Sequence, residues 1–258
     1  FTKFPYLRKV WQRNTEEERL LGVSLTGIYD NAGMTRLDGS LEKTLCELRE
    51  HARKVNHEYS EKLGIEKSAA ITCVKPSGTV SQLVDSASGI HPRHSKFYIR
   101  RVRGDIKDPL SSFLIQQGVP SEACVYKPTQ TVVFSFPQKA PDGMTRADVS
   151  PAQHLEVWLA YQRHWCEHKP SVTISVEEKD WPTVGAWVWE HFDEISGVSF
   201  LPYDGGTYRQ APYEECTEEQ YNELKAKMPK LDWSLFKEET DNVEGAQMLA
   251  CVSGVCEI

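Results

Sequence analysis

The segment Lys75-Pro76-Ser77-Gly78-Thr79-Val80-Ser81 carries groups that suit phosphate binding. This segment follows the short run 71–74, which contains β-branched residues and predicts a buried strand. We expect a helix to begin within residues 75–81. A helix N-terminus presents free backbone N–H groups and a partial positive charge, both of which attract phosphate. The glycine lets a ligand approach the backbone, and the three hydroxyl groups can donate to phosphate oxygens. An ordinary helix cap is the alternative interpretation, and the segment is not a Walker motif because no Gly-x-x-x-x-Gly-Lys is present.

A second group that could carry out chemistry is the pair Cys251 and Cys256, which are separated by four residues near the end of the sequence. Gly254 permits a tight turn between them, so the two thiols can reach disulfide distance. A dithiol on a terminal segment suits thiol–disulfide exchange, because the segment can carry it between two partners. Half of a zinc site and a chance pairing are the alternatives, although no second ligand pair is close in sequence.

A basic cluster extends through residues 93–103 without an intervening acid, and consists of Arg93, Lys96, Arg100, Arg101 and Arg103. Such a cluster could attract a polyphosphate. The preferred interpretation is a solvated strand edge, where charged side chains prevent pairing with another chain.

The segment His164-Trp165-Cys166-Glu167-His168 contains residue types that bind zinc. On a helix, however, positions 164 and 168 share a face while position 166 points away. We therefore predict no metal site here.

Strand and helix patterns alternate along the chain and determine where these groups stand. Apolar residues spaced by three and four predict a helix over 41–59, with Gly64 at its end. Further helices are expected from Ser150-Pro151, from 180–182, and from Thr217, which forms a capping box with Gln220. Strands are expected over 20–29, 71–74, 97–103, 131–136, 171–176 and 198–201. This order predicts an α/β fold with a mainly parallel sheet.

The composition limits the classes to which the chain can belong. Its 258 residues include 30 Lys and Arg and 37 Asp and Glu, which gives a formal net charge of −7. With 26% charged and 40% hydrophobic residues, it is an ordinary globular sequence of one large or two small domains. The acidic charge argues against nucleic-acid binding, and no apolar run reaches the roughly 18–20 residues of a membrane span. The seven scattered cysteines favour a reduced, cytoplasmic protein over a disulfide scaffold.

Several blocks of sequence, in a fixed order, resemble a known enzyme family. The blocks are 21–27, 75–81, 88–92, 98–103, 165–166 with 170–174, 201–206, 210–212 and the cysteine pair 251/256. Each is weak alone, but together they resemble the C-terminal portion of an adenosylcobalamin-dependent (class II) ribonucleotide reductase. The branch they resemble most is the monomeric ribonucleoside-triphosphate reductase. The resemblance covers nearly the whole chain.

This resemblance implies a ten-stranded α/β barrel made of two antiparallel half-sheets, in which a finger loop carries a cysteine that becomes a thiyl radical. Homolysis of the cobalt–carbon bond of adenosylcobalamin generates the radical, which removes the 3′ hydrogen of the nucleotide before a cysteine pair reduces the 2′ position. Residues 1–212 would form the C-terminal part of the barrel, and 213–258 an acidic, partly helical, flexible tail. Residues 76–81 would bind the phosphates of the ribonucleotide substrate. Cys251 and Cys256 would re-reduce the active site and be reduced in turn by a thioredoxin-type donor.

The chain also departs from the family. The Asn-Pro-Cys-…-Glu finger motif is absent, and neither cysteine of the reducing pair can be placed, since both would lie upstream of residues 21–27. We therefore expect a downstream half that needs an N-terminal half of the same enzyme to turn over. A class I large-subunit fragment, a non-catalytic nucleotide-binding module with the same fold and a free-standing thiol–disulfide carrier stay open as alternatives. No catalytic role is predicted for Cys46, Cys73, Cys124, Cys166 or Cys216.

Overall fold

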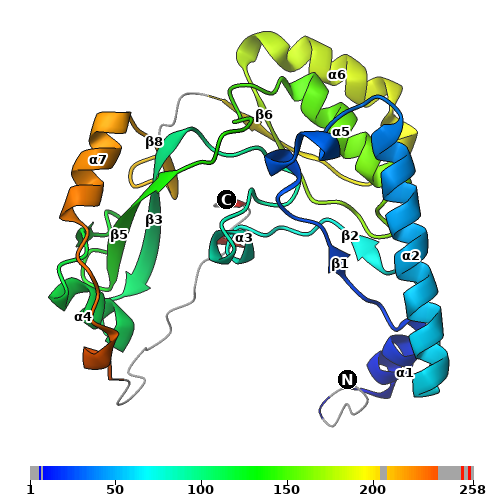
Figure 1. Ribbon diagram of the computed structural model, residues 1–258, viewed down its shortest axis with the longest axis horizontal. Coiled ribbons are helices and arrows are strands. Elements are labelled where there is room, and N and C mark those ends of the chain that lie inside the picture. The colour runs from blue at the N-terminus through cyan, green and yellow to red at the C-terminus, as the bar shows by residue number, and fades with distance from the viewer. Residues whose placement is uncertain (1–5, 7, 204–207, 238–250, 253–254, 257–258) are drawn as a thin grey trace. The chain divides into compact units, whose positions relative to one another are not determined.

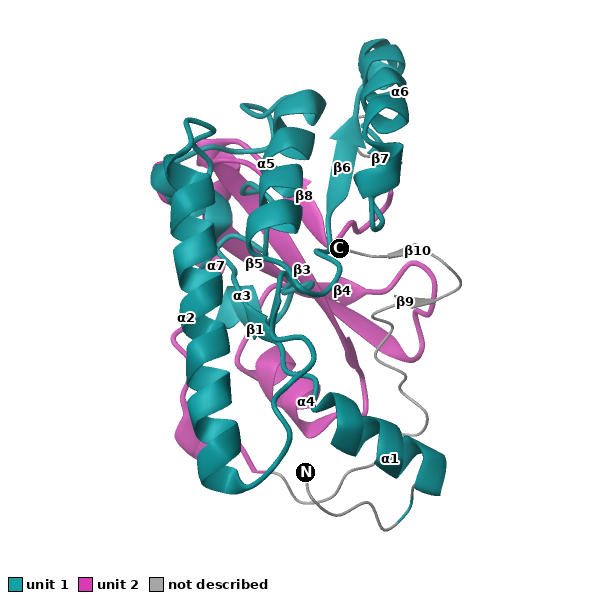
Figure 2. Cartoon of the chain, turned by 90° about the vertical axis from the view of Figure 1, so that its right-hand side faces the viewer, with its two compact units in different colours: residues 1–93, 143–203 teal, residues 94–142, 204–258 magenta. Residues whose placement is uncertain are grey.

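The computed structural model describes residues 6, 8–203 and 208–237, together with the backbone of 251–252 and 255–256. The chain divides into two compact units, which Figure 2 colours separately. Unit 1 comprises residues 1–93 and 143–203, and unit 2 comprises residues 94–142 and 204–258. Both contain helices and strands, so the expected mixed α/β class is confirmed. This division does not test the domain boundary expected between residues 212 and 213, which stays a prediction.

Unit 1 combines helices with two pairs of parallel strands (Figure 1). Strand β1 (Val23–Ser24) pairs with β2 (Thr72–Cys73), and β6 (Thr173–Val176) pairs with β7 (Ser199–Pro202). The helices are α1 (Lys9–Glu18), α2 (Ser40–Leu63), α3 (Val80–Leu83), α5 (Pro151–His164) and α6 (Trp181–Glu190). The 3-10 turns are η1 (Ile28–Asp30), η2 (Ala32–Met34), η3 (Glu178–Asp180) and η4 (Phe192–Glu194). The expected strand over 20–29 is therefore reduced to β1 and followed by a turn.

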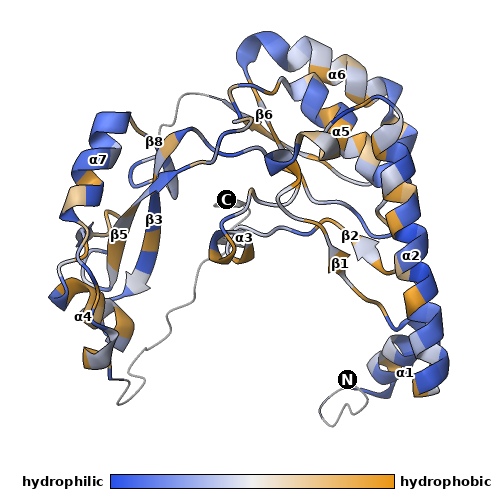
Figure 3. Ribbon diagram, viewed as in Figure 1, coloured by the Kyte–Doolittle hydropathy of each residue, from blue (hydrophilic) through white to orange (hydrophobic). Residues whose placement is uncertain are grey.

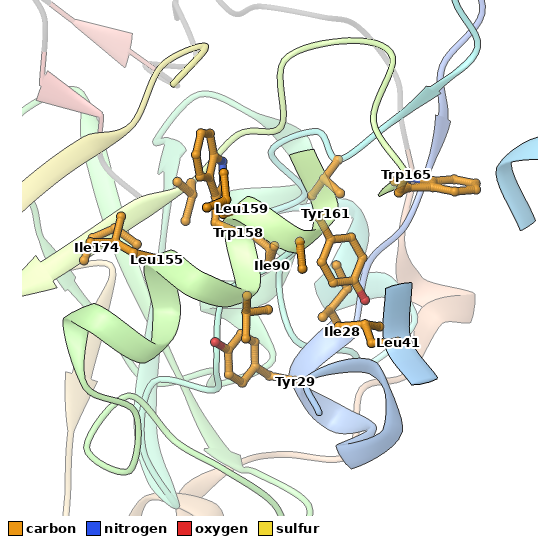
Figure 4. Packing of buried hydrophobic residues seen from close by; sticks show 14 of the residues in the cluster. Ile28, Tyr29, Leu41, Ile90, Leu155, Trp158, Leu159, Tyr161, Trp165 and Ile174 are labelled. Atoms are coloured by element: carbon orange, nitrogen blue, oxygen red, sulfur yellow. The ribbon is translucent and has the colours of Figure 1, made fainter. Parts of the chain in front are cut away.

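The core of unit 1 is built around α5, as Figure 4 shows. Ser150 caps this helix as predicted, since its hydroxyl accepts from the backbone N–H of Gln153 at 3.2 Å. Trp158 and Tyr161 are fully buried, yet Trp158 Nε1–H donates to the Pro170 carbonyl and the Tyr161 hydroxyl donates to the Met34 carbonyl. Their burial therefore leaves no polar atom unsatisfied, and each large side chain stabilises the fold by about 1.5–3 kcal/mol.

The predicted helix over 41–59 is confirmed as α2, and its end at Gly64 is also correct because that glycine has φ 64°. The apolar stripe on this helix is buried only in its first turns. Leu41 and Leu45 belong to the core, whereas Val55 is 38% and Tyr59 56% exposed. The second half of the stripe thus faces away from the core of unit 1.

Unit 2 contains a four-stranded antiparallel sheet in the order β4-β5-β3-β8. Its strands are β3 (Phe97–Asp105), β4 (Ser121–Ala123), β5 (Thr131–Lys139) and β8 (Tyr213–Glu215). The expectation of a mainly parallel sheet is wrong for this unit. The stretch between β3 and β5 contains helix α4 (Pro109–Gln116) and the unpredicted strand β4, and after them β5 returns antiparallel to β3.

One further helix of unit 2 begins at the capping signal predicted from the sequence. Helix α7 (Glu218–Lys227) begins with the predicted capping box, in which Thr217 and Gln220 each accept the other's backbone N–H. The remaining elements are η5 (Trp233–Leu235), β9 (Cys251–Val252) and β10 (Val255–Cys256). Among the described helices of the whole chain, none combines the length and the apolar character needed to cross a lipid bilayer.

Candidate phosphate-binding loop and terminal cysteines

The loop that leads from β2 into α3 in unit 1 ends in an open helix N-terminus. The carbonyl of Ser77 accepts from the N–H of Ser81 at 2.8 Å, so helical hydrogen bonding begins at Ser77. Within the described part of the chain, the N–H groups of Gly78, Thr79 and Val80 have no hydrogen-bond partner. Apart from Gly78 and its two neighbours in sequence, no atom of the described residues lies within 4 Å of the position that a Cβ on Gly78 would occupy. Because α3 has only four residues, these N–H groups rather than a helix dipole would attract an anion.

A cluster of hydroxyl groups holds the two ends of this loop together. Thr26 Oγ1 lies 2.8 Å from Ser77 Oγ, donates to the Ala87 carbonyl at 3.0 Å and accepts from the N–H of Gly89 at 2.9 Å. Ser77 Oγ also lies 3.4 Å from Ser88 Oγ. Gly89 has φ 52°, and a Cβ there would come within 3.2 Å of the Lys75 carbonyl, so this position requires glycine.

An arginine buried behind the loop fixes the turn that follows α3. Arg93 is 7% exposed, and its Nε and Nη2 donate to the two carboxylate oxygens of Asp30 at 2.9 and 3.0 Å. Its guanidinium also donates to the carboxylate and to the carbonyl of Asp85, which has φ 48°. Asp30 Oδ2 accepts from the N–H of Ala87 at 2.7 Å. The bidentate pair thus connects η1 to residues 85–87.

Two histidines, His91, which is half-buried, and His154, which is buried, support the same segment. His91 Nδ1–H donates to the Ser88 carbonyl and its Nε2 accepts from the N–H of Thr173, each at 2.9 Å, which selects the neutral ring. Burial lowers the pKa of His91. His154 Nε2–H donates to the Ile90 carbonyl at 2.8 Å, and burial, followed by the neighbouring His91, lowers the pKa of His154 to about 3. Neutral imidazoles therefore connect residues 88–91 to β6 and α5.

The predicted site residues have different surroundings in the loop. Pro76, Thr79 and Val80 are exposed, whereas Ser77 and Gly78 are half-buried. Ser81 is completely buried, and its hydroxyl donates to the Ser77 carbonyl within the loop.

Sequence reasoning did not single out Thr26, Asp30 or His91 for the support of this loop. The signal available was weak, because Thr26 is one polar residue inside an apolar stretch and Asp30 stands at its end.

The remaining arginines of the basic cluster hold a neighbouring segment of unit 2. The strand-edge interpretation is wrong, since β3 is an interior strand of its sheet. Arg100 donates to the Pro212 carbonyl at 3.2 Å, and Arg103 donates to the Gln210 carbonyl at 2.9 Å. Arg101 pairs with Glu214. These contacts fasten residues 210–214 to β3, and the side chain of Gln210 adds hydrogen bonds to Val125 N–H and the Ala123 carbonyl.

The segment 164–168 has separate contacts at its two ends. His164 Nδ1 lies 3.4 Å from Cys46 Sγ, and His168 Nε2–H donates to the Leu21 carbonyl at 2.8 Å. Burial raises the pKa of Cys166 to about 12. In the part of the chain that the structure describes, no group of three or more His, Cys, Asp or Glu side chains could hold a metal ion.

The backbone around the terminal cysteines forms a short antiparallel ladder. Its register places Cys251 opposite Cys256 and Val252 opposite Val255. Residues directly opposite in such a ladder have Cα atoms about 4.5–5.5 Å apart, which lies within the range that a disulfide can span. The side chains lie outside the described part of the structure, so the redox role stays a prediction.

The chain is similar over most of its length to several known proteins. No family model matches the chain. An adenosylcobalamin-dependent ribonucleoside-triphosphate reductase of Euglena gracilis is 32% identical, over 95% of this chain and 35% of the relative. Enzymes of the same name include one of Lactobacillus leichmannii, 26% identical over 98% of this chain and 39% of the relative. A probable one of Dictyostelium discoideum is 30% identical over 100% of this chain and 34% of the relative.

A solved structure gives the same result at the level of the fold. The crystal structure of a B12-dependent (class II) ribonucleotide reductase superposes with a TM-score of 0.73 at 26% identity, covering 86% of this chain and 35% of that one. The chain spans about a third of the length of the relatives it matches. It is thus similar, over nearly its whole length, to part of the adenosylcobalamin-dependent ribonucleotide reductases.

Proposed function

We propose that this chain is part of an adenosylcobalamin-dependent reductase that converts ribonucleoside triphosphates to 2′-deoxyribonucleotides, and that residues 76–81 bind the substrate phosphates. The observation that carries the proposal is the open N-terminus of α3, where the N–H groups of Gly78, Thr79 and Val80 face no protein partner in the described part of the chain. The similarity to relatives named for this reaction supports it.

The chemistry of the loop suits a polyphosphate. Each N–H can donate a charge-assisted hydrogen bond, and the hydroxyl of the exposed Thr79 can add another. The buried Arg93 is paired with Asp30 and holds the turn behind the loop, so its charge is already compensated and it does not compete for the anion. The role of this chain in the reaction would therefore be to bind and orient the nucleotide.

The cofactor is proposed from similarity alone. The hollow between α1 and the end of α2 is lined largely by charged side chains, including Arg13, Glu16, Glu17 and Glu66, and such a lining does not suit the flat corrin ring of cobalamin. We therefore assign no residue to the cofactor. Adenosylcobalamin would supply the initial radical when bound to the complete enzyme.

The terminal cysteines would carry reducing equivalents. In this proposal the dithiol of Cys251 and Cys256 is oxidised to a disulfide while an active-site disulfide is reduced to two thiols. A dithiol donor of the thioredoxin type then reduces the tail disulfide and is itself oxidised. The antiparallel register that sets the two cysteines opposite each other supports this role.

The rest of the barrel would come from an N-terminal part of the same enzyme. In the described residues, the parallel sheets of unit 1 have only two strands each, whereas parallel sheets are normally larger and covered on both faces. The hydrophobic colouring of α3 in Figure 3 marks a second incomplete region, since Val80, Leu83 and Val84 are 63%, 86% and 61% exposed. These features support the proposal that an N-terminal part of the enzyme adds strands and covers these surfaces, as the proposed ten-stranded barrel requires. A cytoplasmic location stays a prediction.

The phosphate site can be tested by removing one N–H donor. Gly78 lies before α3 and its N-cap residue Thr79, and its N–H has no partner in the described part of the chain, so proline there removes a donor without breaking a helical hydrogen bond. The Gly78→Pro variant should bind inorganic tripolyphosphate more weakly by about 1.5–3 kcal/mol, which is roughly 10- to 150-fold in Kd. Gly78→Ala keeps the N–H and has open space for its Cβ, so it serves as the matched control. Equal titration-calorimetry affinities for the two variants would contradict the proposed site.

A further inference from the structure

We propose that Thr26 is a positioning residue that holds the hydroxyl of Ser77 away from the phosphate site. In this arrangement Ser77 donates no side-chain proton to the anion. The inference rests on the proposed phosphate binding by residues 76–81. Within that segment, backbone N–H groups would bind the anion and the Ser77 hydroxyl would not.

The direction of the hydrogen bonds follows from counting protons on Thr26. A hydroxyl has one proton and two acceptor positions. The Ala87 carbonyl can only accept, so the Thr26 proton lies in that contact at 3.0 Å. The N–H of Gly89 can only donate, and it occupies one acceptor position of Thr26 at 2.9 Å. The third contact, 2.8 Å from Ser77 Oγ, must then be donated by Ser77.

The same reasoning shows which hydrogen bond the Ser77 hydroxyl donates. Its single proton points to Thr26, so its 3.4 Å contact with Ser88 Oγ is one that Ser88 donates. The protons therefore run in one direction, from Ser88 to Ser77, from Ser77 to Thr26 and from Thr26 to the Ala87 carbonyl. Ser77 has no second proton for a phosphate oxygen.

This arrangement explains why the helix N-terminus is open. A serine at the start of a helix ordinarily turns its hydroxyl oxygen back to accept from the N–H two or three residues ahead. Here Thr79, the residue before α3, makes no side-chain cap hydrogen bond, and the hydroxyl of Ser77 two residues earlier is engaged with Thr26 and Ser88. The N–H groups of Thr79 and Val80 stay available for an anion. Without the Thr26 hydroxyl, Ser77 would be free to cap these N–H groups and would compete with phosphate.

The experiment measures the affinity of the intact chain for inorganic tripolyphosphate by titration calorimetry. Thr26→Val removes the hydroxyl at nearly constant shape and should weaken binding about tenfold, the size of a typical capping interaction. Thr26→Ser retains the hydroxyl and should bind within about threefold of the wild type. Thermal unfolding of each variant checks that the fold is intact.

A double-mutant cycle separates positioning from a merely structural role. In a Ser77→Ala background no hydroxyl remains to cap the helix, so adding Thr26→Val should change Kd by less than about twofold. An equal loss from Thr26→Val in both backgrounds would overturn the inference, as would a Thr26→Val chain that binds like the wild type. A wild-type chain that binds no tripolyphosphate would instead overturn the proposed phosphate site, and the inference with it.

Discussion

Lowering the pH from 7 to 5 should destabilise unit 1 through the buried imidazole of His154. This ring donates to the Ile90 carbonyl at 2.8 Å and packs edge-on against Tyr29 and His91. Burial lowers its pKa from 6.5 to about 3, whereas the unfolded chain keeps the ordinary value. Between these two values the unfolded state binds a proton that the folded state does not. The stability contribution of the neutral ring is therefore complete above pH 6.5 and is lost as the pH falls toward 3.

The size of the effect follows from the separation of the two pKa values. Each pH unit below the unfolded pKa costs about 1.4 kcal/mol, so the loss from His154 at pH 5 is about 2 kcal/mol. That is a large share of the roughly 5–15 kcal/mol by which a domain is ordinarily stable. His91 acts in the same direction, because burial lowers its pKa as well.

The assay is urea unfolding at pH 7, 6 and 5, followed by the fluorescence of Trp158 and Trp165 in the same core. In the His154→Gln variant, the amide N–H can still donate to the Ile90 carbonyl but does not titrate. The wild type should lose about 2 kcal/mol more than this variant between pH 7 and pH 5, because all other titrating groups are common to both. Equal losses in the two chains would refute the assignment of a buried neutral imidazole at position 154.

Two further predictions concern the loop support and the tail. Asp30→Asn should lower the free energy of unfolding by about 2–3 kcal/mol, because it leaves the buried Arg93 guanidinium without its bidentate partner. Asp85→Asn should lower it by about 1 kcal/mol or less, because the Asp85 side chain is 81% exposed. Equal costs by urea titration would show that Asp30 is not the main anion in this cluster. In an assembled enzyme, Cys251→Ser should abolish turnover driven by a thioredoxin-type donor and spare a single turnover from prereduced enzyme. Multiple turnover at the wild-type rate would exclude the proposed shuttle.

The sequence predicted those elements whose signals are local. Ser150 and Pro151 mark the start of α5, Thr217 and Gln220 form the capping box of α7, and Gly64 ends α2. Each signal involves residues within one helical turn, and the physics of capping acts over that same distance.

The support of the candidate site could not be predicted because it depends on distant residues. Thr26 meets Ser77 across 51 positions, and Asp30 meets Arg93 across 63. The sequence assigns Arg93 to the basic cluster because several of its neighbours in sequence are basic, whereas its partners in the structure are the acids Asp30 and Asp85, which folding brings near. The prediction of parallel strands was wrong for unit 2 for a similar reason, because the residues of one strand do not determine the direction of the neighbouring strand.

We propose that this chain is part of an adenosylcobalamin-dependent ribonucleotide reductase, and reconstitution of the enzyme can test this. The most direct test joins the chain to an N-terminal part that carries the Asn-Pro-Cys motif and measures deoxyribonucleotide formation from a ribonucleoside triphosphate, with a dithiol reductant present. The account predicts product only when both parts and adenosylcobalamin are supplied. No product under those conditions, from two parts that demonstrably assemble, or product formed at the same rate without adenosylcobalamin, would contradict it.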